Sequence, residues 1–389
     1  MTNQLTARRL IAADSILEYP RIAIDDDGTI VSIEPGEPNS NDTTLSAAFF
    51  DIHVHGAAGH DAMEGTPRAL NRIGEFLACK GVAHFLATTV TASMDRTLRA
   101  LEGIADAIEA AESDPSLHAA RPVGIHLEGP FLSHAKRGVH PPEDLQSPSI
   151  RLFQRMQLAA RGHIRLITIA PEIDGALDLI DYAVAQGIHI SIGHSDATAA
   201  QARAAIAAGA ASATHTFNAM RRLDHREPGI AGVVLDTEGL YAELICDGIH
   251  VAPEFVRLWL RAKGGDHAIL VTDGISATGM PDGNYMLGDF EVTVREGRCL
   301  SAIDLAEGVE TLAGSVLTMD RAVANLQQFT GASLATAVRL ASRNPARMLG
   351  LHTLGEIAVG QPANFNVFAA DGTLLQTMLR GRVLDTIPC

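Results

Sequence analysis

The feature that most constrains the fold is an alternation, in the middle of the chain, between short apolar runs and helix-forming stretches. The runs have the composition of buried strands, whereas segments such as 95–112 and 196–210 are rich in alanine, the strongest helix former. Eight strands joined by helical connections are typical of a (β/α)8 TIM barrel, an α/β fold. The eight runs are 49–55, 83–90, 122–128, 164–172, 188–194, 211–217, 241–247 and 268–274.

An open doubly wound sheet also alternates strands with helices and is the main alternative fold. Such sheets commonly bind nucleotides through a glycine-rich turn after an early strand. Neither GxGxxG nor GxxxxGK[ST] follows an early apolar run in this chain. The sequence therefore favours the barrel.

Both ends of the chain differ from the middle, because they consist of short β segments separated by Gly and Pro. A hairpin is predicted in residues 21–36, with its turn at Asp27-Gly28. We expect residues 1–48 and 350–389 to form one small β-sandwich domain built from both termini, and residues 49–349 to form the barrel. Within the barrel segment, 283–300 is predicted to be a hairpin, and 333–351 a helix in which Pro345 opens a second short helix.

Composition excludes several classes of function. The formal net charge is −16 over 389 residues, which argues against an extended nucleic-acid surface. The four cysteines show no CxxC spacing, as expected in a reducing compartment. We find neither a signal-peptide apolar region nor an uncharged apolar stretch of about 18 residues, and so we expect no membrane span and a cytoplasmic protein.

Ionisable residues recur where the predicted strands end. All strands of a TIM barrel end at one mouth, so these side chains are expected to meet there. Imidazole and carboxylate together suit zinc or a similar metal, and an open coordination position suits an activated water. The residues concerned are His53 and His55 at the end of the first run, Glu128 at the end of the third, His194 of the fifth, His215 of the sixth and Asp273 of the eighth, and His250 just after the seventh.

Each of these residues also has an ordinary structural interpretation. A single histidine at a strand end is commonly a hydrogen-bonded polar residue, and Glu128 or Asp273 would be suitable helix N-caps. All of these interpretations would have to hold together, at the same end of different strands. The metal-site interpretation of the whole set is therefore preferred.

The motifs that surround these residues resemble those of N-acetylglucosamine-6-phosphate deacetylases, of the amidohydrolase superfamily. The resemblance runs over roughly residues 5 to 385. The combination of HLEGPF with THTFNAM is specific to this family, whereas HxH alone would indicate only some amidohydrolase. The motifs, in chain order, are DIHVHG, GIHLEGPFLS, KRGVH, SIGHS, THTFNAM, REPGIAG, DGIHV, VTDG and TLAGSVLTMDRAV.

The resemblance implies a role for each matching position of the metal centre. Glu128, His194 and His215 match the ligands of the better-conserved metal position, and Asp273 matches the general base and acid. His53 and His55 match a pair from which some members build a second metal position, with Glu128 bridging and Asp273 nearby. The alternative is a vacant or half-filled second position.

The resemblance also implies substrate contacts. Arg226 and His250 match phosphate-binding residues, and Asn218 and Ala219 match positions that offer amide or backbone donors to the same group. His140 matches a histidine that contacts substrate and polarises the acetyl carbonyl. An ion pair of Arg226 with Glu227 is the structural alternative.

The implied reaction is metal-dependent hydrolysis of N-acetyl-D-glucosamine 6-phosphate to D-glucosamine 6-phosphate and acetate. Alternatives are the N-acetylgalactosamine 6-phosphate epimer or another N-acyl substrate at the same site, and a non-catalytic barrel that serves as a binding module. We expect one or two divalent metals per chain, with zinc first and iron, manganese or cobalt as alternatives. The resemblance further implies a homodimer, with a neighbouring subunit near the phosphate.

Overall fold

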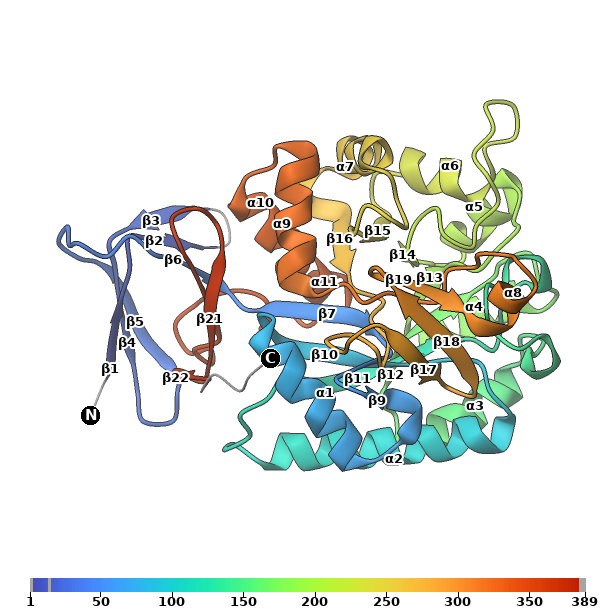
Figure 1. Ribbon diagram of the computed structural model, residues 1–389, viewed down its shortest axis with the longest axis horizontal. Helices are drawn as coiled ribbons and strands as arrows, with labels where there is room; N and C mark the ends of the chain where they lie inside the picture. The colour runs from blue at the N-terminus through green and yellow to red at the C-terminus, as the bar shows by residue number, and fades with distance from the viewer. Residues whose placement is uncertain (1–2, 13–14, 385–389) are drawn as a thin grey trace.

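The computed structural model describes residues 3–12 and 15–384 (Figure 1). Its centre is one sheet of eight parallel strands, in which strands consecutive along the chain are neighbours. A parallel bridge between Val54 and Gly274 joins the first strand to the segment after the last one, which closes the barrel. The predicted (β/α)8 barrel is therefore confirmed, and the open doubly wound sheet is excluded. The strands are β7 (Phe49–Val54), β10 (Val82–Thr89), β11 (Arg121–Glu128), β12 (Ile164–Ile169), β13 (His189–Ile192), β14 (Ser212–Ala213), β15 (Tyr241–Ile245) and β16 (Ala268–Val271).

The barrel strands are buried on both faces, which explains their nearly continuous apolar composition. All eight residues of β10 are buried, and so are all six of β7. Helices surround the sheet and present apolar stripes to it, as Leu70, Ile73 and Leu77 do in α1. The helices are α1 (Pro67–Cys79), α2 (Met94–Ser113), α3 (Ile150–Ala159), α4 (Ala176–Ala185), α5 (Ala199–Ala207), α6 (Gly229–Asp236), α7 (Pro253–His267), α9 (Met319–Thr330), α10 (Leu334–Ala341) and α11 (Arg343–Met348).

A smaller β unit lies beside the barrel and contains strands from both ends of the chain (Figure 1). The N-terminal β6 pairs antiparallel with the C-terminal β20, and Leu45, Ile22 and Phe365 share one apolar core. The predicted hairpin forms with Gly28 in its turn at φ 78°. The exact domain boundaries after residue 48 and before residue 350 stay predictions. The strands are β1 (Asn3–Thr6), β2 (Arg9–Ile11), β3 (Ile16–Glu18), β4 (Pro20–Ile24), β5 (Ile30–Pro35), β6 (Thr44–Ala47), β20 (Phe365–Phe368), β21 (Leu374–Leu379) and β22 (Arg382–Val383).

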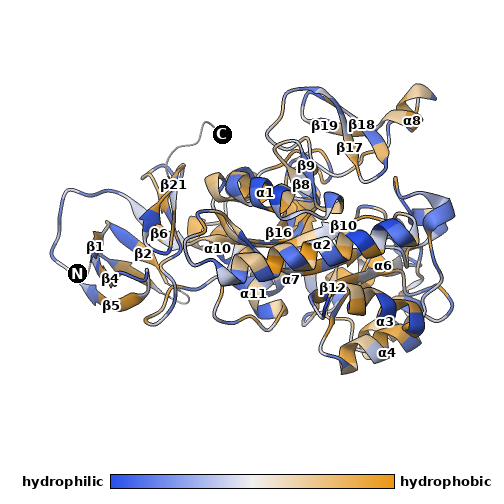
Figure 2. Ribbon diagram, turned by 90° about the horizontal axis from the view of Figure 1, so that it is seen from below, coloured by the Kyte–Doolittle hydropathy of each residue, from blue (hydrophilic) through white to orange (hydrophobic). Residues whose placement is uncertain are grey.

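A third, small layer follows β16 and lies at the end of the barrel away from the β unit (Figure 2). The hairpin predicted in 283–300 is here a sheet of three strands, because a second turn at Glu296-Gly297 adds another strand. Leu287 and Val292 pack into an apolar core of their own. The elements of this layer are β17 (Gly283–Leu287), β18 (Phe290–Arg295), β19 (Arg298–Ser301) and α8 (Ala302–Ala306).

Two further expectations are corrected in detail. The run 211–217 is a strand only at Ser212–Ala213, because His215 and Phe217 adopt positive φ angles of 25° and 80° that turn the chain. The second short helix, α11, begins at Arg343, two residues before Pro345. Within the described ranges, no helix is both long and apolar enough to cross a membrane. The remaining short elements are β8 (Gly56–Ala57), β9 (His60–Asp61), η1 (Ala62–Glu64), η2 (His134–Lys136) and η3 (Pro142–Asp144).

Candidate metal centre and active site

Glu128, His194 and His215 converge at the mouth of the barrel. Oε1 of Glu128 lies 3.2 Å from Nε2 of each histidine, and the two Nε2 atoms are 3.1 Å apart. Ligand atoms held about 2.0–2.1 Å from a tetrahedral zinc lie roughly 3.3 Å from one another. The three side chains are buried, and their spacing fits a single divalent ion.

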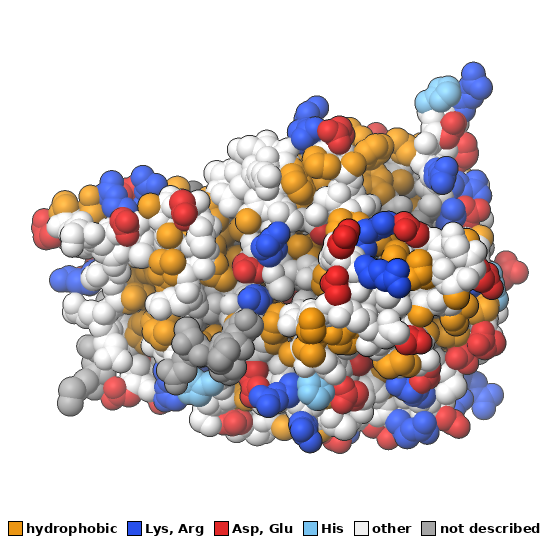
Figure 3. Space-filling view, in the orientation of Figure 1, with side chains coloured by type: hydrophobic (Ala, Val, Ile, Leu, Met, Phe, Trp, Pro, Cys, Tyr) orange, Lys and Arg blue, Asp and Glu red, His pale blue; other side chains and the backbone are white. Residues whose placement is uncertain are grey.

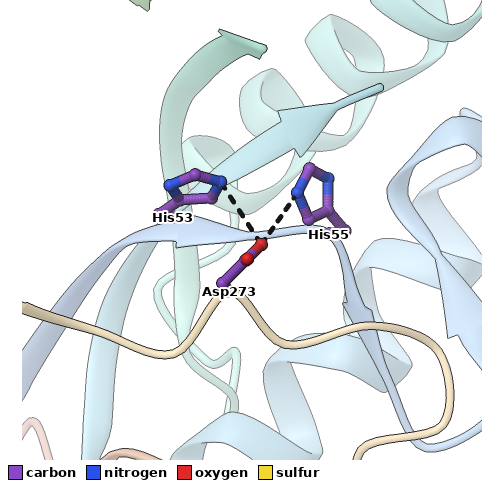
Figure 4. A group of neighbouring side chains, drawn as sticks. All are labelled: His53, His55 and Asp273. Atoms are coloured by element: carbon purple, nitrogen blue, oxygen red, sulfur yellow. Dashed lines mark ion pairs between the residues drawn. The ribbon is translucent and has the colours of Figure 1, made fainter. Parts of the chain in front are cut away.

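His53, His55 and Asp273 form a second group of the same kind (Figure 4). Both histidines lie at the end of β7, and Asp273 follows β16 at the place where the barrel closes. Oδ1 of Asp273 lies 3.4 Å from Nε2 of His53 and 3.2 Å from Nε2 of His55. This group also offers three ligand atoms to one ion.

Glu128 joins the two groups. Its Oε1 faces His194 and His215 and is also 3.3 Å from Nε2 of His53, whereas its Oε2 is 3.2 Å from Nε2 of His55. A carboxylate shared in this way is a common bridge in two-metal sites, where the ions are about 3.5–4 Å apart. The residues present therefore fit one or two divalent metals.

The outer nitrogens of these imidazoles face hydrogen-bond acceptors. Nδ1 of His55 lies 3.2 Å from the carbonyl oxygen of Thr88, and Nδ1 of His194 lies 2.9 Å from that of Lys136. A carbonyl accepts only from an N–H, so the proton of each neutral ring is on Nδ1. The lone pair of Nε2 is then free for a metal, as in many metal-ligating histidines.

The carboxylates and imidazoles of the metal-free centre shift one another's pKa. Burial lowers the pKa of His55, but the hydrogen bonds that its ring donates to Asp273 and Glu128 outweigh burial and raise that pKa to about 9. Burial raises the pKa of Asp273, but the charges of His53 and His55 outweigh it and bring that pKa to about 2. A cation at this place would therefore displace protons that the carboxylates otherwise hold on the rings.

The ordinary interpretation of the two carboxylates as helix caps does not apply. Neither Glu128 nor Asp273 is the N-cap of any helix in residues 3–12 and 15–384; the caps are other residues, such as Thr66, Ser149 and Thr198. The two buried carboxylates instead face the four histidines, which is the arrangement expected of a metal centre.

His140 is oriented in the opposite way to the other histidines. The backbone N–H of Thr91 donates to its Nδ1 at 3.2 Å, and the Thr91 hydroxyl is 2.8 Å from the same nitrogen. Because Nδ1 accepts, the ring proton is on Nε2, which lies 3.7 Å from Oε2 of Glu128. Burial, and then the charge of His194, lower the pKa of His140 to about 3, so that the ring is a neutral hydrogen-bond donor at the centre.

A cavity of about 600 Å³ opens over these residues, a size suited to a small metabolite. Asn218, Ala219 and His250, three of the four predicted phosphate contacts, line it. His250 is held by a 2.6 Å contact between its Nδ1 and Oδ2 of Asp247. The structure thus brings the predicted substrate contacts close to the predicted metal ligands, with one exception.

The exception is Arg226, which does not line the cavity of its own chain. It is exposed on the loop 221–228, which projects from the body of the molecule between β14 and α6 (Figure 1) and carries basic side chains and a histidine at its tip (Figure 3). The alternative ion pair with Glu227 does not form in the described chain; Oε1 of Glu227 instead accepts the backbone N–H of Ala199 at 2.9 Å.

Sequence reasoning missed two basic residues, Lys136 and Arg222, which line the cavity. Nζ of Lys136 is 3.7 Å from Asp196, whereas Arg222 has no ion-pair partner in the described part of the chain. The pair Arg221-Arg222 directly after the FNAM motif was the available signal. Arg221 pairs with Asp196 and leaves Arg222 as the arginine at the cavity.

A buried carboxylate, Glu243, was also missed. It lies in the middle of β15, and its Oε2 is 3.1 Å from Nδ1 of His53. The signal was a glutamate within the otherwise apolar start of the run 241–247.

Comparison with known proteins agrees with this geometry. Residues 44–384 match the model of the amidohydrolase family. The chain belongs to the amidohydrolase family. This amidohydrolase is 35% identical over 383 residues to N-acetylglucosamine-6-phosphate deacetylase of Bacillus subtilis (strain 168), with 96% of this chain and 95% of the relative covered. It is 37% identical over 378 residues to N-acetylgalactosamine-6-phosphate deacetylase of Escherichia coli O157:H7, with 96% of each chain covered.

A solved structure shares the fold of this amidohydrolase over almost its whole length. It is that of an aspartate-to-alanine mutant of N-acetyl-D-glucosamine-6-phosphate deacetylase from Mycobacterium smegmatis in complex with N-acetyl-D-glucosamine-6-phosphate. The TM-score is 0.91 at 34% identity, and 98% of this chain and 99% of the other are covered. The family predicted from the motifs is therefore confirmed.

Proposed function

We propose that this amidohydrolase hydrolyses the acetamide of N-acetyl-D-glucosamine 6-phosphate to D-glucosamine 6-phosphate and acetate. The observation that carries the proposal is the grouping of two metal-ligand sets, a neutral donor histidine and the lining of one cavity at the barrel mouth. The similarity to N-acetylglucosamine-6-phosphate deacetylases over nearly the whole chain supports the substrate. Every expected ligand position carries a residue that can bind a metal, which argues against a non-catalytic binding module.

A bound metal, Asp273 and His140 would each contribute a different part of the chemistry. A divalent metal, when bound by Glu128, His194 and His215, supplies an activated water and polarises an amide carbonyl. Asp273 accepts the proton of the attacking water and returns it to the amine that leaves. The Nε2–H of His140 donates to the carbonyl oxygen, where negative charge develops in the transition state.

The phosphate is remote from the bond that reacts, and its role is to position the acetamide. We propose that Asn218, Ala219 and His250 contact it, together with Arg222 from the same chain. An arginine fork matches a phosphate geometrically, and Arg222 is the cavity arginine without an acidic partner in the described chain. Binding energy from the phosphate would then be used to raise the rate on the acetamide.

We further propose a homodimer in which Arg226 acts at the cavity of the partner chain. Its exposed position on a projecting loop supports this role, because its side chain is not part of the lining of its own cavity. The test is complementation between two inactive variants, Arg226→Ala and Asp273→Asn. Co-expression should restore activity, because a mixed dimer has one centre with both Asp273 and the partner's Arg226. If mixed dimers form but stay inactive, Arg226 does not act across the interface.

The galacto epimer is the second candidate substrate, because the relative from Escherichia coli O157:H7 carries that name at 37% identity. Zinc is the metal we propose first, with iron, manganese or cobalt as alternatives, since imidazole and carboxylate ligands accept all four. A cytoplasmic location stays a prediction of the sequence.

The deciding experiment is acetate release from both epimers and from unphosphorylated N-acetylglucosamine, on one preparation assayed for metals. We expect turnover of the gluco phosphate and at least a tenfold lower kcat/KM without the phosphate. Preferred turnover of the galacto phosphate would select the second candidate. A metal-loaded protein that releases no acetate from either phosphate would refute the proposed substrate class.

A further inference from the structure

Glu243 is a completely buried carboxylate at the centre of the barrel. It lies in β15 between the buried residues Ala242 and Leu244, and its exposed fraction is 0%. Within the described residues no Lys or Arg pairs with it, and its only ion-pair partner is His53. An isolated buried carboxylate is costly, so one without a cationic side chain calls for another source of compensation.

One oxygen of Glu243 contacts both metal-ligand groups. Oε2 lies 3.1 Å from Nδ1 of His53, which belongs to the group of His55 and Asp273. The same Oε2 accepts the backbone N–H of His215 at 3.2 Å, and His215 belongs to the group of Glu128 and His194. No hydrogen-bond partner in the described chain faces the other oxygen, Oε1.

The backbone of Glu243 also hydrogen-bonds the turn that contains His215. Its carbonyl oxygen accepts the N–H of Thr216 at 2.8 Å, next to His215. His215 has a φ of 25°, outside the ordinary range for a residue with a side chain. Two consecutive N–H groups of this turn are therefore bound by one residue, which fixes the direction in which the His215 ring leaves the backbone.

His53 differs from its neighbours in the partner of its outer nitrogen. His55 and His194 each face a backbone carbonyl at Nδ1, whereas His53 faces a carboxylate. A carboxylate holds the proton on Nδ1 and makes Nε2 a stronger electron donor than a carbonyl does. Through His53, the charge of a bound metal would compensate the buried charge of Glu243.

We propose that Glu243 is a positioning residue that couples the two metal positions of this centre. Its carboxylate orients and strengthens His53 as a ligand, and the same oxygen fixes the His215 turn. The inference rests on the proposed metal centre but not on the identity of the sugar, and so it is tested by metal binding without substrate.

The test compares the wild-type protein with Glu243→Gln and Glu243→Leu. Each is stripped of metal and titrated with zinc against a competing chelator, and then with cobalt, whose visible absorption reports ligand geometry. We expect the second equivalent of zinc to bind about 10-fold more weakly to the Glu243→Gln variant, which keeps a hydrogen-bond acceptor but not the charge. Binding to the Glu243→Leu variant should be weaker by up to about 100-fold. The cobalt spectrum of the first equivalent should shift in Leu, because the His215 turn is released.

Thr168→Val is the matched control. Thr168 is also completely buried in the barrel. Its backbone pairs with that of Glu128, which valine preserves, and its hydroxyl hydrogen-bonds His126 and Thr214 and, within the described chain, none of the proposed ligands. We expect this variant to lower thermal stability and to keep wild-type zinc affinity. Wild-type affinity and cobalt spectra in Glu243→Gln would overturn the proposal, and this variant decides the test if Glu243→Leu does not fold. Equal affinity losses in the control and in Glu243→Gln would also overturn it, because a general packing effect would then suffice.

Discussion

At the scale of single residues, the hydrogen-bond partner decides what a histidine can do at this centre. His55 and His194 face carbonyl oxygens at Nδ1 and present a lone pair at Nε2. His140, in the same cavity, accepts the N–H of Thr91 at Nδ1 and presents a proton at Nε2. The same side-chain type is therefore a ligand at two positions and a donor at the third.

His140→Leu should lower kcat by about 100-fold or more, because the developing oxyanion loses a preorganised donor. Metal content should stay at the wild-type level. The pKa of His140 is lowered to about 3, so the ring is already neutral above about pH 4. In the plot of kcat/KM against pH, the fall on the acid side should therefore occur at the same pH in the variant as in the wild-type protein. A fall that moves with the substitution would show that His140 titrates in the working range.

Asp273→Asn should remove most turnover, by a factor on the order of 10²–10⁴, because an amide cannot carry the proton between water and amine. The metal position of Glu128, His194 and His215 does not include this carboxylate and should stay occupied. The rate of acetate release and the metal content are measured on the same preparation of the variant. Asp178→Asn on the exposed face of α4 is the control and should be fully active. Near-normal turnover in Asp273→Asn would contradict the proton-transfer role.

At the scale of elements, the separation of two neighbouring strands sets the distance between His194 and His215. Gly193, at the end of β13, faces Thr214 after β14. A methyl group on Gly193 would lie 2.6 Å from Cβ of Thr214 and 3.3 Å from Cγ2 of Thr168. Since Cβ of Thr214 belongs to the rigid part of its side chain, the two strands would have to move apart.

Gly193→Ala should therefore destabilise the protein by about 1–3 kcal/mol, the usual cost of overpacking, and weaken metal binding at the position of His194 and His215. Thermal unfolding and zinc titration measure the two effects. Gly239→Ala is the matched control, because a methyl group there meets nothing within 4 Å. If Gly193→Ala unfolds and binds zinc like the control, the glycine does not set the strand spacing.

At the scale of the whole molecule, the buried metal centre links metal binding, pH and stability. Strands from both ends of the barrel sheet contribute ligands, so a bound ion holds β7, β11 and the segment after β16 together. A metal that binds only the folded chain raises its stability by mass action. Chelation should thus lower the melting temperature of the entire barrel.

The stabilisation by metal should grow as the pH rises. In the metal-free protein the pKa of His55 is raised from its ordinary 6.5 to about 9 by Asp273 and Glu128, against the effect of burial. A raised folded-state pKa contributes stability that is complete below about pH 6.5 and is lost as the pH passes through 9. Metal binding requires the unprotonated ring, so apparent metal affinity rises over the same range.

Calorimetric unfolding of loaded and stripped protein at pH 6, 7, 8 and 9 measures the difference directly. We expect the gap between the two melting temperatures to widen with pH, and zinc binding near neutral pH to release protons into the buffer. A gap that is constant over this range would show that the carboxylates do not hold a proton on the centre.

Much of this molecule could be predicted from its sequence. The alternation of buried strands with helices follows from local composition and period, and it predicts a barrel. Because all barrel strands end at one mouth, the polar residues at the ends of β7 and β11 and directly after β16 can be assigned to one site from the sequence alone. Motifs in chain order added the family and the proposed reaction.

The tertiary structure decided the contacts that depend on partners distant in the chain. Only the folded barrel places Oε2 of Glu243 beside His53, 190 residues away, or the N–H of Thr91 on His140. Likewise, it leaves Arg226 on an exposed loop and brings Arg222 to the cavity, although both follow the same motif. Local sequence determines which residues end a strand, because composition and period act over a few residues. The partner of each side chain is set by packing between strands, which no local pattern encodes.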